Sequence, residues 1–505
     1  MGVWDTLLPS LGPSSLLGVG VLLLLVFLFC PHRTSSQKHR KEPPGPTPIP
    51  ILGNLHQLDL KRPDQTFMKF AKKYGSVFTV YMGPRKMVVL TGYKTMKEAL
   101  VNYAEEFGER EAPTVAKEAH LDYGVVWANG DSWREMRRFA LSTLRDFGMG
   151  KRACEDKIIP ECHSLLKEIS KFQGEAFDPT LIINSAVCNV ICSMVYGTRF
   201  EYDDPDFRAI LSRTMKGIQL LGSPGVQLHN LFPRIGRLFL SASKQINQIF
   251  TANKNYHLKL LKETFTPHTC KSIADYHSHC APDLHLQEDG CPNSHFHNAN
   301  ILVTIMNLFT ADTETTAATL RWALLFMAKY PKIQDQVQEE LSRVMEGRQV
   351  TVEDRQRLPF TDAVIHETQR KANIIPLSLL HRTSQDVTFK GYFIEKGTTV
   401  IPVLTSVLYD ENEWEKPNIF YPAHFLSKDG KFLKRDAFMP FSAGRRLCLG
   451  ESLARMELFL FFSTLLQHFR ITPPLGVSEE ELDLTPRPGG TLSPQPHKLC
   501  LVSLK

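Results

Sequence analysis

The stretch FSAGRRLCLGESLARMELFLFF, residues 441–462, places a lone cysteine, Cys448, between two arginines and a glycine, just ahead of a long apolar run. Arginines close in sequence, glycines that let backbone amides approach, and the positive end of the helix expected after the cysteine all favour a thiolate. Such a thiolate serves as a nucleophile or as a metal ligand. The third interpretation is a structural cysteine at the start of a helix.

A nucleophile normally needs a neighbouring base, whereas a single axial thiolate on a haem iron needs only an apolar pocket and amide donors to the sulfur. The segment FSAGRRLCLG resembles the haem-binding signature F-x-x-G-x-R-x-C-x-G of cytochromes P-450. Its fixed positions are matched at Phe441, Gly444, Arg446, Cys448 and Gly450. The resemblance implies that Cys448 is the axial thiolate ligand, and therefore the metal ligand, of a haem b iron.

The resemblance extends over nearly the whole chain and is closest to microsomal family 2. PPGPTPIPILGN resembles the proline hinge, WREMR the W-x-x-x-R helix, HETQR the E-x-x-R pair, YPAHF the meander motif and FTADTETT the oxygen-activation motif. The length of 505 residues alone would suggest two to four domains. The resemblance instead implies a mainly α fold, with one large cytochrome P-450-type helical domain and minor β-sheets, behind an N-terminal transmembrane anchor.

The sequence pattern of the body also predicts helices with a minority of strands. Residues 300–330 are apolar nearly all round in their first half, which is typical of a helix buried in the middle of a large fold. Residues 332–345 and 360–372 have the pattern of amphipathic helices. Residues 387–408 alternate β-branched and aromatic residues between Lys-Gly turns, so we expect short strands there.

The composition narrows the class of protein. A hydrophobic content of 43% and a charged content of 22% allow a sizeable core. The net charge of +6 does not by itself indicate nucleic acid, and we expect no nucleic-acid partner. The chain has ten cysteines; in a cytosol-facing chain they should be mostly reduced, with Cys188 and Cys192 as buried core thiols on one helix face.

The amino-terminal segment predicts a membrane anchor. Residues 6–31 carry no charge, and twenty-odd such residues can cross a bilayer core of ~30 Å as a helix. A cleaved signal peptide is the alternative, but Asp5 precedes the segment instead of basic residues and no A-x-A-like site follows. The basic residues that follow directly place the rest of the chain in the cytosol.

These features divide the chain into three parts. We expect a membrane anchor at residues 1–31, with the span at about 7–30, a basic and proline-rich hinge at 32–54, and a haem-thiolate catalytic domain at 55–505. Five prolines make the hinge stiff and extended. The expected location is the endoplasmic reticulum membrane, with a single-pass anchor and a catalytic domain facing the cytosol.

By resemblance, the haem propionates would be held by Trp133, Arg137, Arg110, His381 and Arg446. Arginine forks suit carboxylates, and the other members add hydrogen-bond donors. For Arg110 and His381 the alternative is a solvated surface charge. Leu380 also stands where the family has a proline, which weakens the assignment of His381.

The oxygen-activation motif predicts two catalytic residues, Glu314 and Thr315, over the haem iron. The reaction consumes protons, and an acid–alcohol pair can relay them. A glutamate inside an apolar helix is also rare unless it is paired or functional. The E-x-x-R residues Glu367 and Arg370, three apart on one helix face, are interpreted as a structural lock on the meander, with an ordinary surface ion pair as the alternative.

Electrons must come from a partner, because the sequence has neither a G-x-G-x-x-G after a strand nor a phosphate-binding loop motif. The expected donor is an NADPH-dependent cytochrome reductase, with cytochrome b5 as a second candidate. The basic residues within 133–152 would steer an acidic reductase, or are simply a solvated helix face.

Three places depart from the family pattern. Asp312 replaces a glycine of the oxygen-activation motif, and Lys371 replaces an apolar residue after the E-x-x-R pair. Residues 268–297 are rich in His and Cys, where a mobile loop is preferred to a zinc site because the spacing fits no zinc module. We expect Asp312 to capture the hydroxyl of Thr315 or Thr316 and to make oxygen activation leaky; alternatively it turns away, neutral and satisfied.

The sequence therefore predicts a monooxygenase that inserts one atom of dioxygen into a lipophilic small molecule. Fatty acids, steroids and xenobiotics all remain open, since the segments expected around the substrate are mixed apolar and polar. They are residues 112–126, 212–228, 305–315, 375–380 and 489–490. One alternative is a haem-thiolate protein with impaired or non-monooxygenase activity; the other is a membrane-tethered metal- or partner-binding protein.

Deleting residues 1–33 should leave a protein that folds, binds haem and still partly associates with membranes. A cytosol-facing body needs no membrane span to pack its core, and family members commonly add apolar surface near the anchor. Haem content and sedimentation with vesicles measure the two properties. A truncated chain that never binds haem would place part of the fold inside the deleted segment.

Overall fold

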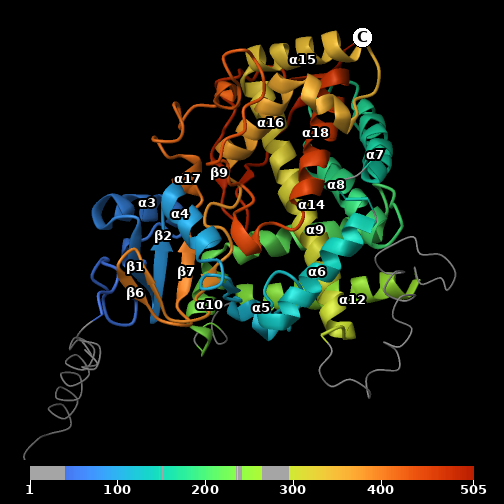
Figure 1. Cartoon of the computed structure of the whole chain (residues 1–505). Helices are drawn as coiled ribbons and strands as arrows, with labels where there is room; N and C mark the ends of the chain where they lie inside the picture. Colours follow the sequence, from blue (N-terminus) through green and yellow to red (C-terminus); the bar gives the residue numbers. More distant parts are fainter. Residues whose placement is uncertain are drawn as a thin grey trace, which may run out of the picture.

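The computed structural model describes residues 40–146, 148–149, 152–234, 236, 241–263 and 295–504. A body of helices packs beside a small mixed sheet (Figure 1). The α-helices are α3 (Pro63–Tyr74), α4 (Tyr93–Lys97), α5 (Thr114–Glu118), α6 (Gly130–Asp146), α7 (Arg152–Ser170), α8 (Thr180–Val195), α9 (Pro205–Leu221), α10 (Pro224–Leu231), α12 (Ser241–Glu263), α14 (Asn298–Lys329), α15 (Pro331–Met345), α16 (Pro359–Ala372), α17 (Thr405–Leu408) and α18 (Glu451–His468).

Short helical turns connect these elements. They are η2 (Leu55–Gln57), η3 (Glu98–Asn102), η5 (Val352–Arg357), η6 (Pro422–Phe425) and η7 (Gly444–Arg446). The mainly helical fold with minor sheets that the sequence predicts is confirmed, and the helices expected at residues 332–345 and 360–372 correspond to α15 and α16.

Strands form one larger sheet and three pairs. The five-stranded sheet has the order β1-β2-β7-β4-β3, with β2 and β7 parallel and its other neighbours antiparallel. The strands are β1 (Val77–Met82), β2 (Arg85–Leu90), β3 (Glu109–Arg110), β4 (His381–Arg382), β5 (Val387–Phe389), β6 (Tyr392–Ile394), β7 (Thr399–Pro402), β8 (Phe469–Thr472), β9 (Pro486–Arg487), β10 (Ser493–Pro494) and β11 (Cys500–Ser503). The short strands expected within residues 387–408 are therefore present as β5, β6 and β7.

Helix α14 is the axis of the helical body (Figure 1). It runs for 32 residues, begins where the His297 side chain accepts a hydrogen bond from the Asn300 amide, and buries most of its side chains. It packs against α8, α16 and α18. The prediction of a long buried helix is confirmed, because a helix that is apolar nearly all round needs neighbours on every side.

The main hydrophobic core lies between α7, α8, α14, α15 and α18. The apolar run after Cys448 forms most of α18 and is buried in this core. Cys188 and Cys192 lie one turn apart on α8, both buried, with 3.9 Å between their sulfur atoms. The interpretation of these two as core thiols is confirmed.

The E-x-x-R pair is a buried ion pair that holds α16 to the meander segment. The side chains of Glu367 and Arg370 are fully buried. Two nitrogens of the Arg370 guanidinium each donate a hydrogen bond of 2.7 Å, one to each carboxylate oxygen of Glu367. Arg370 also donates to the carbonyls of Leu408, Pro417 and Ile419. This network fixes α16 to the meander, so the structural interpretation is confirmed and the surface ion pair is excluded.

The hinge segment is described from residue 40 onward and is attached to the sheet. The Thr79 amide donates to the Pro44 carbonyl at 2.7 Å, and the Asn54 side chain donates to the carbonyls of Pro46 and Thr47. A Cβ at Gly45 would lie 2.0 Å from the Thr79 oxygen, so only glycine allows this close approach.

Two predicted segments lie largely outside the described residues. These are the anchor at residues 1–31 and the His/Cys-rich tract, of which only 295–297 are described. Within the described ranges, no helix combines the length and apolarity needed to span a bilayer. In the same ranges, no group of three or more His, Cys, Asp and Glu side chains is arranged to hold a metal ion.

Replacing Arg370 with lysine should lower the free energy of unfolding by about 3 kcal/mol, because one ammonium cannot supply the donors that Arg370 gives to Glu367 and three carbonyls. Denaturant unfolding measures the change. Arg134→Lys is the matched control, since the ion pair of Arg134 with Asp131 is exposed. An equal decrease in the free energy of unfolding in the two variants would contradict a stabilising role for the Glu367–Arg370 network.

Candidate active site

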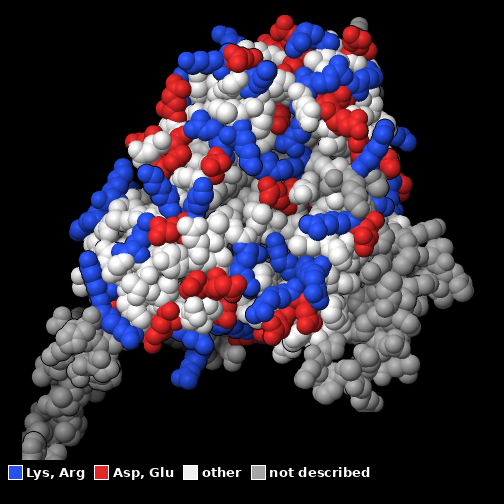
Figure 2. Space-filling view, in the orientation of Figure 1, with Lys and Arg blue, Asp and Glu red and all other residues white. Residues whose placement is uncertain are grey.

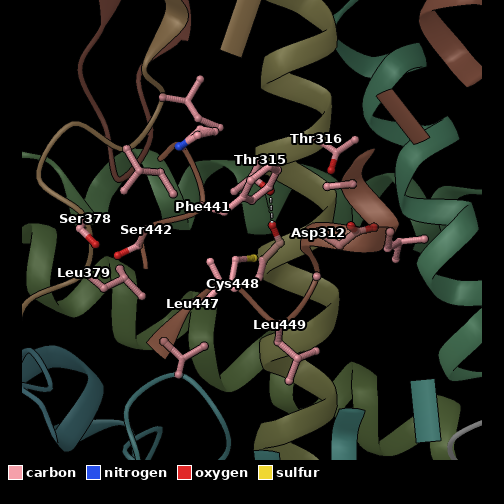
Figure 3. Close-up of a pocket in the computed structure, with 18 of the residues that line it drawn as sticks. Asp312, Thr315, Thr316, Ser378, Leu379, Phe441, Ser442, Leu447, Cys448 and Leu449 are labelled. Atoms are coloured by element: carbon pink, nitrogen blue, oxygen red, sulfur yellow. Dashed lines mark hydrogen bonds between the residues drawn. The ribbon is translucent and has the colours of Figure 1, made fainter. Parts of the chain in front are cut away.

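An internal cavity of about 240 Å³ separates α14 from the loop that carries Cys448. In Figure 3, Cys448 lies on the loop side and Thr315 on the α14 side. The cavity wall is completed by residues 374–375 and 378–379 and by the start of α18. Two of the segments expected around the substrate, 212–228 and 489–490, do not line this cavity; they pack on each other, with Gly222 against Gly489.

The turn around Cys448 explains why its motif contains glycine. Gly444 has a φ of 71°, and a Cβ there would lie 1.7 Å from the Leu100 carbonyl oxygen. Only glycine fits both constraints. The turn then brings the Cys448 amide to the Phe441 carbonyl at 3.1 Å, and the Gly450 amide hydrogen-bonds the sulfur. The thiol is open to the cavity and is otherwise surrounded by protein.

The neighbouring arginines do not stabilise a thiolate as the sequence suggested. Arg445 turns to Glu105, and Arg446 donates to the carbonyls of Gly108 and Ala128. Burial raises the pKa of the Cys448 thiol, and the Gly450 amide and Arg137 only partly offset this rise. Coordination to a metal cation deprotonates a thiol outright, so a ligand role for Cys448 does not require a lowered pKa in the free protein.

Three guanidinium groups meet at one end of the cavity. Arg110 donates to the Leu379 carbonyl at 2.7 Å, Arg137 donates to the Leu447 carbonyl at 2.6 Å, and Arg446 lies 3.7 Å from the ring centre of Trp133. Burial, reinforced by the nearby Arg137, lowers the pKa of Arg110 to about 9. Burial, with Arg110 and Arg137 beside it, lowers the pKa of Arg446 to about 8. A cluster of this kind has positive charge that its protein neighbours do not neutralise.

Buried donors in the same region also lack partners. Within the described chain, the buried N–H groups at Trp133 Nε1 and Arg446 Nη1 make no hydrogen bond. His381 Nε2 also has no partner there, but the His381 proton lies on Nδ1, which donates to the Phe107 carbonyl at 2.7 Å, so Nε2 donates only when an anion nearby protonates the ring. Buried donors in native proteins are almost always paired. The combination of unpaired donors and excess positive charge fits the two carboxylates of haem. Arg110 and His381 are 6% and 1% exposed, so the alternative of solvated surface groups is excluded for both.

The two residues predicted to act in proton relay are separated. Thr315 lines the cavity, and its hydroxyl donates to the Ala311 carbonyl at 2.7 Å. Glu314 is buried away from the cavity, where it pairs with Arg321 at 3.0 Å and accepts a hydrogen bond from Ser493. The predicted placement of Glu314 over the iron is therefore wrong. On this stretch of α14, Asp312, Thr315 and Thr316 line the cavity and Glu314 does not.

Asp312 lies on the cavity wall but does not bond to Thr315 or Thr316 as expected. Its Oδ2 atom has no hydrogen-bond partner among the described residues, and burial raises the pKa of this carboxyl group to about 7. The carboxyl oxygens of Glu457 on α18 are also buried without partners there, and burial together with Asp312 raises the pKa of Glu457 well above its usual value. The alternative, in which Asp312 turns away from the hydroxyl of Thr315, is closer to the observed geometry. Sequence reasoning missed Glu457; its signal is one acidic residue within the apolar run MELFLFF.

A sequence model of the family described as Cytochrome P450 matches residues 43–501. The chain belongs to this family of haem-thiolate monooxygenases, and haem is its cofactor. It is 53% identical to Cytochrome P450 2K1 of Oncorhynchus mykiss over the full length of both chains. It is 50% identical to Cytochrome P450 2K6 of Danio rerio over 90% of each, and 43% identical to Cytochrome P450 2C23 of Rattus norvegicus over 96% of this chain and 99% of the relative.

Trp133→Phe should weaken haem retention about tenfold, because the variant loses a buried indole N–H that has no partner among the described residues. A hydrogen bond to a charged group contributes about 1.5–3 kcal/mol. Haem transfer from the holoprotein to an excess of apomyoglobin measures retention. Trp322→Phe is the control, since the indole of Trp322 already donates to the Leu492 carbonyl at 2.9 Å. It should lower stability without a selective effect on haem transfer; equal transfer rates would contradict the assignment of Trp133.

Proposed function

We propose that this protein oxidises a lipophilic small molecule at the endoplasmic reticulum membrane, with electrons from an NADPH-dependent flavoprotein reductase. The observation that carries the proposal is the cavity itself: a thiol on one wall, a threonine-bearing helix opposite, and unneutralised cations at one end. Fatty acids, steroids and xenobiotics are the substrate classes considered.

Each site residue has a proposed role in holding or serving the cofactor. Cys448 would bind the haem iron through its thiolate, and Trp133, Arg137, Arg110, His381 and Arg446 would hold the propionates. When bound, haem supplies a redox-active iron whose thiolate ligand favours cleavage of the O–O bond. Thr315, which lines the cavity, positions water for proton transfer.

The cavity lining supports a lipophilic substrate. Its apolar side chains include Val125, Leu308, Ile374 and Leu379, and Ala311 also faces it. Polar side chains such as Asn307 and Ser378 also line it, but most of the exposed cavity surface is apolar. Ligand sites that are mostly apolar with a few polar groups orient a hydrophobic compound without charge pairing.

The basic face of α6 supports docking of an acidic reductase. Figure 2 shows Lys and Arg side chains gathered over α6. Arg134, Arg138 and Arg145 of this helix are exposed, whereas Arg137 points inward to the Leu447 carbonyl beside Cys448. Charge at such a surface steers an oppositely charged partner. Cytochrome b5 is a second candidate for the same face.

The proposed membrane attachment rests on the sequence alone. An anchor at residues 1–31 and a hinge at 32–54 would hold the catalytic domain at 55–505 against the cytosolic side of the membrane. The described part of the hinge supports a fixed orientation of the hinge relative to the catalytic domain, because Pro44 and Asn54 are hydrogen-bonded to β1.

Reconstitution tests the proposal. The full chain with reductase and NADPH should convert at least one member of a panel of fatty acids, steroids and xenobiotics that changes the spin state of its haem. Cys448→Ala should abolish the thiolate-type carbon monoxide difference spectrum and product formation, whereas Cys500→Ala, which removes a thiol of β11, should retain both. A normal spectrum in Cys448→Ala would overturn the ligand assignment. Haem incorporation without any reductase-dependent product would favour an impaired relative.

A further inference from the structure

Residues 373–379, which follow α16, form one wall of the cavity and have an uncommon backbone conformation. The φ angles of Asn373 and Ser378 are 42° and 53°. Residues other than glycine rarely adopt positive φ, and they keep it only where surrounding contacts hold the backbone. The cavity is lined from this wall by Asn373, Ile374, Ile375, Ser378 and Leu379 (Figure 3). The shape of the wall therefore depends on the contacts that anchor it.

Two backbone contacts anchor the wall near its ends. The Leu379 carbonyl accepts a hydrogen bond from Arg110 at 2.7 Å, so one end is held by the arginine cluster of the cavity. The Ile374 carbonyl accepts a hydrogen bond from the Leu492 amide at 2.8 Å. Neither contact holds the side chain of Asn373 or the middle of the wall.

A third anchor is a chain of buried side chains that begins on the outer helix α3. Asn373 Nδ2 donates to the Thr405 hydroxyl at 2.8 Å, and this hydroxyl donates to Asp64 Oδ2 at 3.0 Å. Asn373, Thr405 and Asp64 are only 4%, 3% and 0% exposed. The Thr405 amide also donates to the Pro376 carbonyl, in the middle of the wall, at 3.2 Å. A hydroxyl that accepts from an amide and donates to a carboxylate is polarised by both partners, which strengthens each hydrogen bond.

Asp64 is itself fixed on α3. Arg62 donates to both of its carboxylate oxygens, at 3.0 and 2.9 Å, and Gln65 donates to Oδ2 at 3.2 Å. Helix α3 packs against α17, which begins at Thr405 (Figure 1). The α3 side chain of Phe67 also belongs to an apolar cluster against which Leu377 of the wall packs. Helix α3 thus supports the wall from outside, although Asp64 does not line the cavity.

We propose that Asp64 is a positioning residue for ligand selectivity. Through Thr405 and Asn373 it fixes the shape of the 373–379 wall, and so determines which lipophilic compounds fit the cavity. The carboxylate suits this role because hydrogen bonds to a charged acceptor are stronger than those to a neutral one. Without the chain the wall relaxes, and a ligand that packs against it must bear the cost of ordering it. The inference rests on the monooxygenase function and assigns part of its selectivity to a residue outside the cavity.

Two probes report on the wall in the ferric holoprotein without turnover. Imidazole and 4-phenylimidazole both bind haem iron and shift the Soret band, but only the phenyl ring of the second extends toward the cavity walls. Thr405→Val removes the hydroxyl at constant shape. It should weaken 4-phenylimidazole binding about tenfold, as for one lost hydrogen bond to a charged group, and leave imidazole binding unchanged. Thr405→Ser keeps the hydroxyl and should retain both affinities.

Asp64→Asn is the second variant, and it should also weaken 4-phenylimidazole binding selectively. A carboxamide is a weaker acceptor for the Thr405 hydroxyl, and Arg62 loses its charged partner. Should Thr405→Val fail to fold, Asp64→Asn decides the question. Unchanged 4-phenylimidazole affinity in the variants that fold would overturn the role of Asp64.

The chain offers a matched control for each substitution. The buried Thr361 hydroxyl donates to the Glu340 carboxylate at 2.7 Å, and the buried Asp354 accepts hydrogen bonds from Arg348 and Thr351. Thr361 and Asp354 do not line the cavity. Thr361→Val and Asp354→Asn should therefore lower stability while both probes bind as in the wild type.

Two patterns of affinity would attribute the effect to general damage and overturn the inference. One is an equal loss of imidazole and 4-phenylimidazole affinity in Thr405→Val. The other is a selective loss of 4-phenylimidazole affinity in the control variants as well.

Turnover separates this inference from the proposed function. With reductase, NADPH and a panel compound that yields two products, Thr405→Val should change the ratio of the products, and Thr405→Ser should retain it. A wild type that forms no product overturns the proposed function, whereas the probe affinities still decide the role of Asp64.

Discussion

Positive charge buried without a protein counter-charge is the constraint on which the rest of this structure depends. Arg110, Arg137 and Arg446 converge at one end of the cavity and bond mainly to backbone carbonyls. Mutual repulsion in a dry environment is costly, and an anionic group that entered this end of the cavity would relieve it. Cofactor binding then contributes directly to folding stability, because a ligand that binds only the native state shifts the equilibrium toward it.

Local spacing predicted those parts of the fold and site that depend on a single segment. The Cys448 turn requires glycine at 444, the burial of α14 follows from its apolar circumference, and the E-x-x-R pair follows from spacing on one helix face. The residues that would hold the propionates could also be proposed from motifs, and two of them, Trp133 and Arg446, contribute unpaired buried donors.

What the sequence could not predict depends on contacts between helices. Glu314 and Thr315 are adjacent, yet only the partners on α8 and β10 determine that Glu314 turns inward to Arg321. The electrostatic effect of Asp312 on Glu457 could not be predicted without knowing that α14 packs against α18. Arg445 is likewise drawn to Glu105, which is distant in sequence. In each case the conformation of the side chain is determined by contacts with residues outside its own segment.

The inward position of Glu314 has a consequence for how the cavity can change shape. One carboxylate group accepts hydrogen bonds from Asn184 on α8, Arg321 on α14, and Thr491 and Ser493 near the chain end. Displacement of any one segment leaves a buried charge underbonded, so these segments move together or not at all. Adaptation to compounds of different size must then fall on elements outside this cluster, and the breadth of substrates accepted is set by their flexibility.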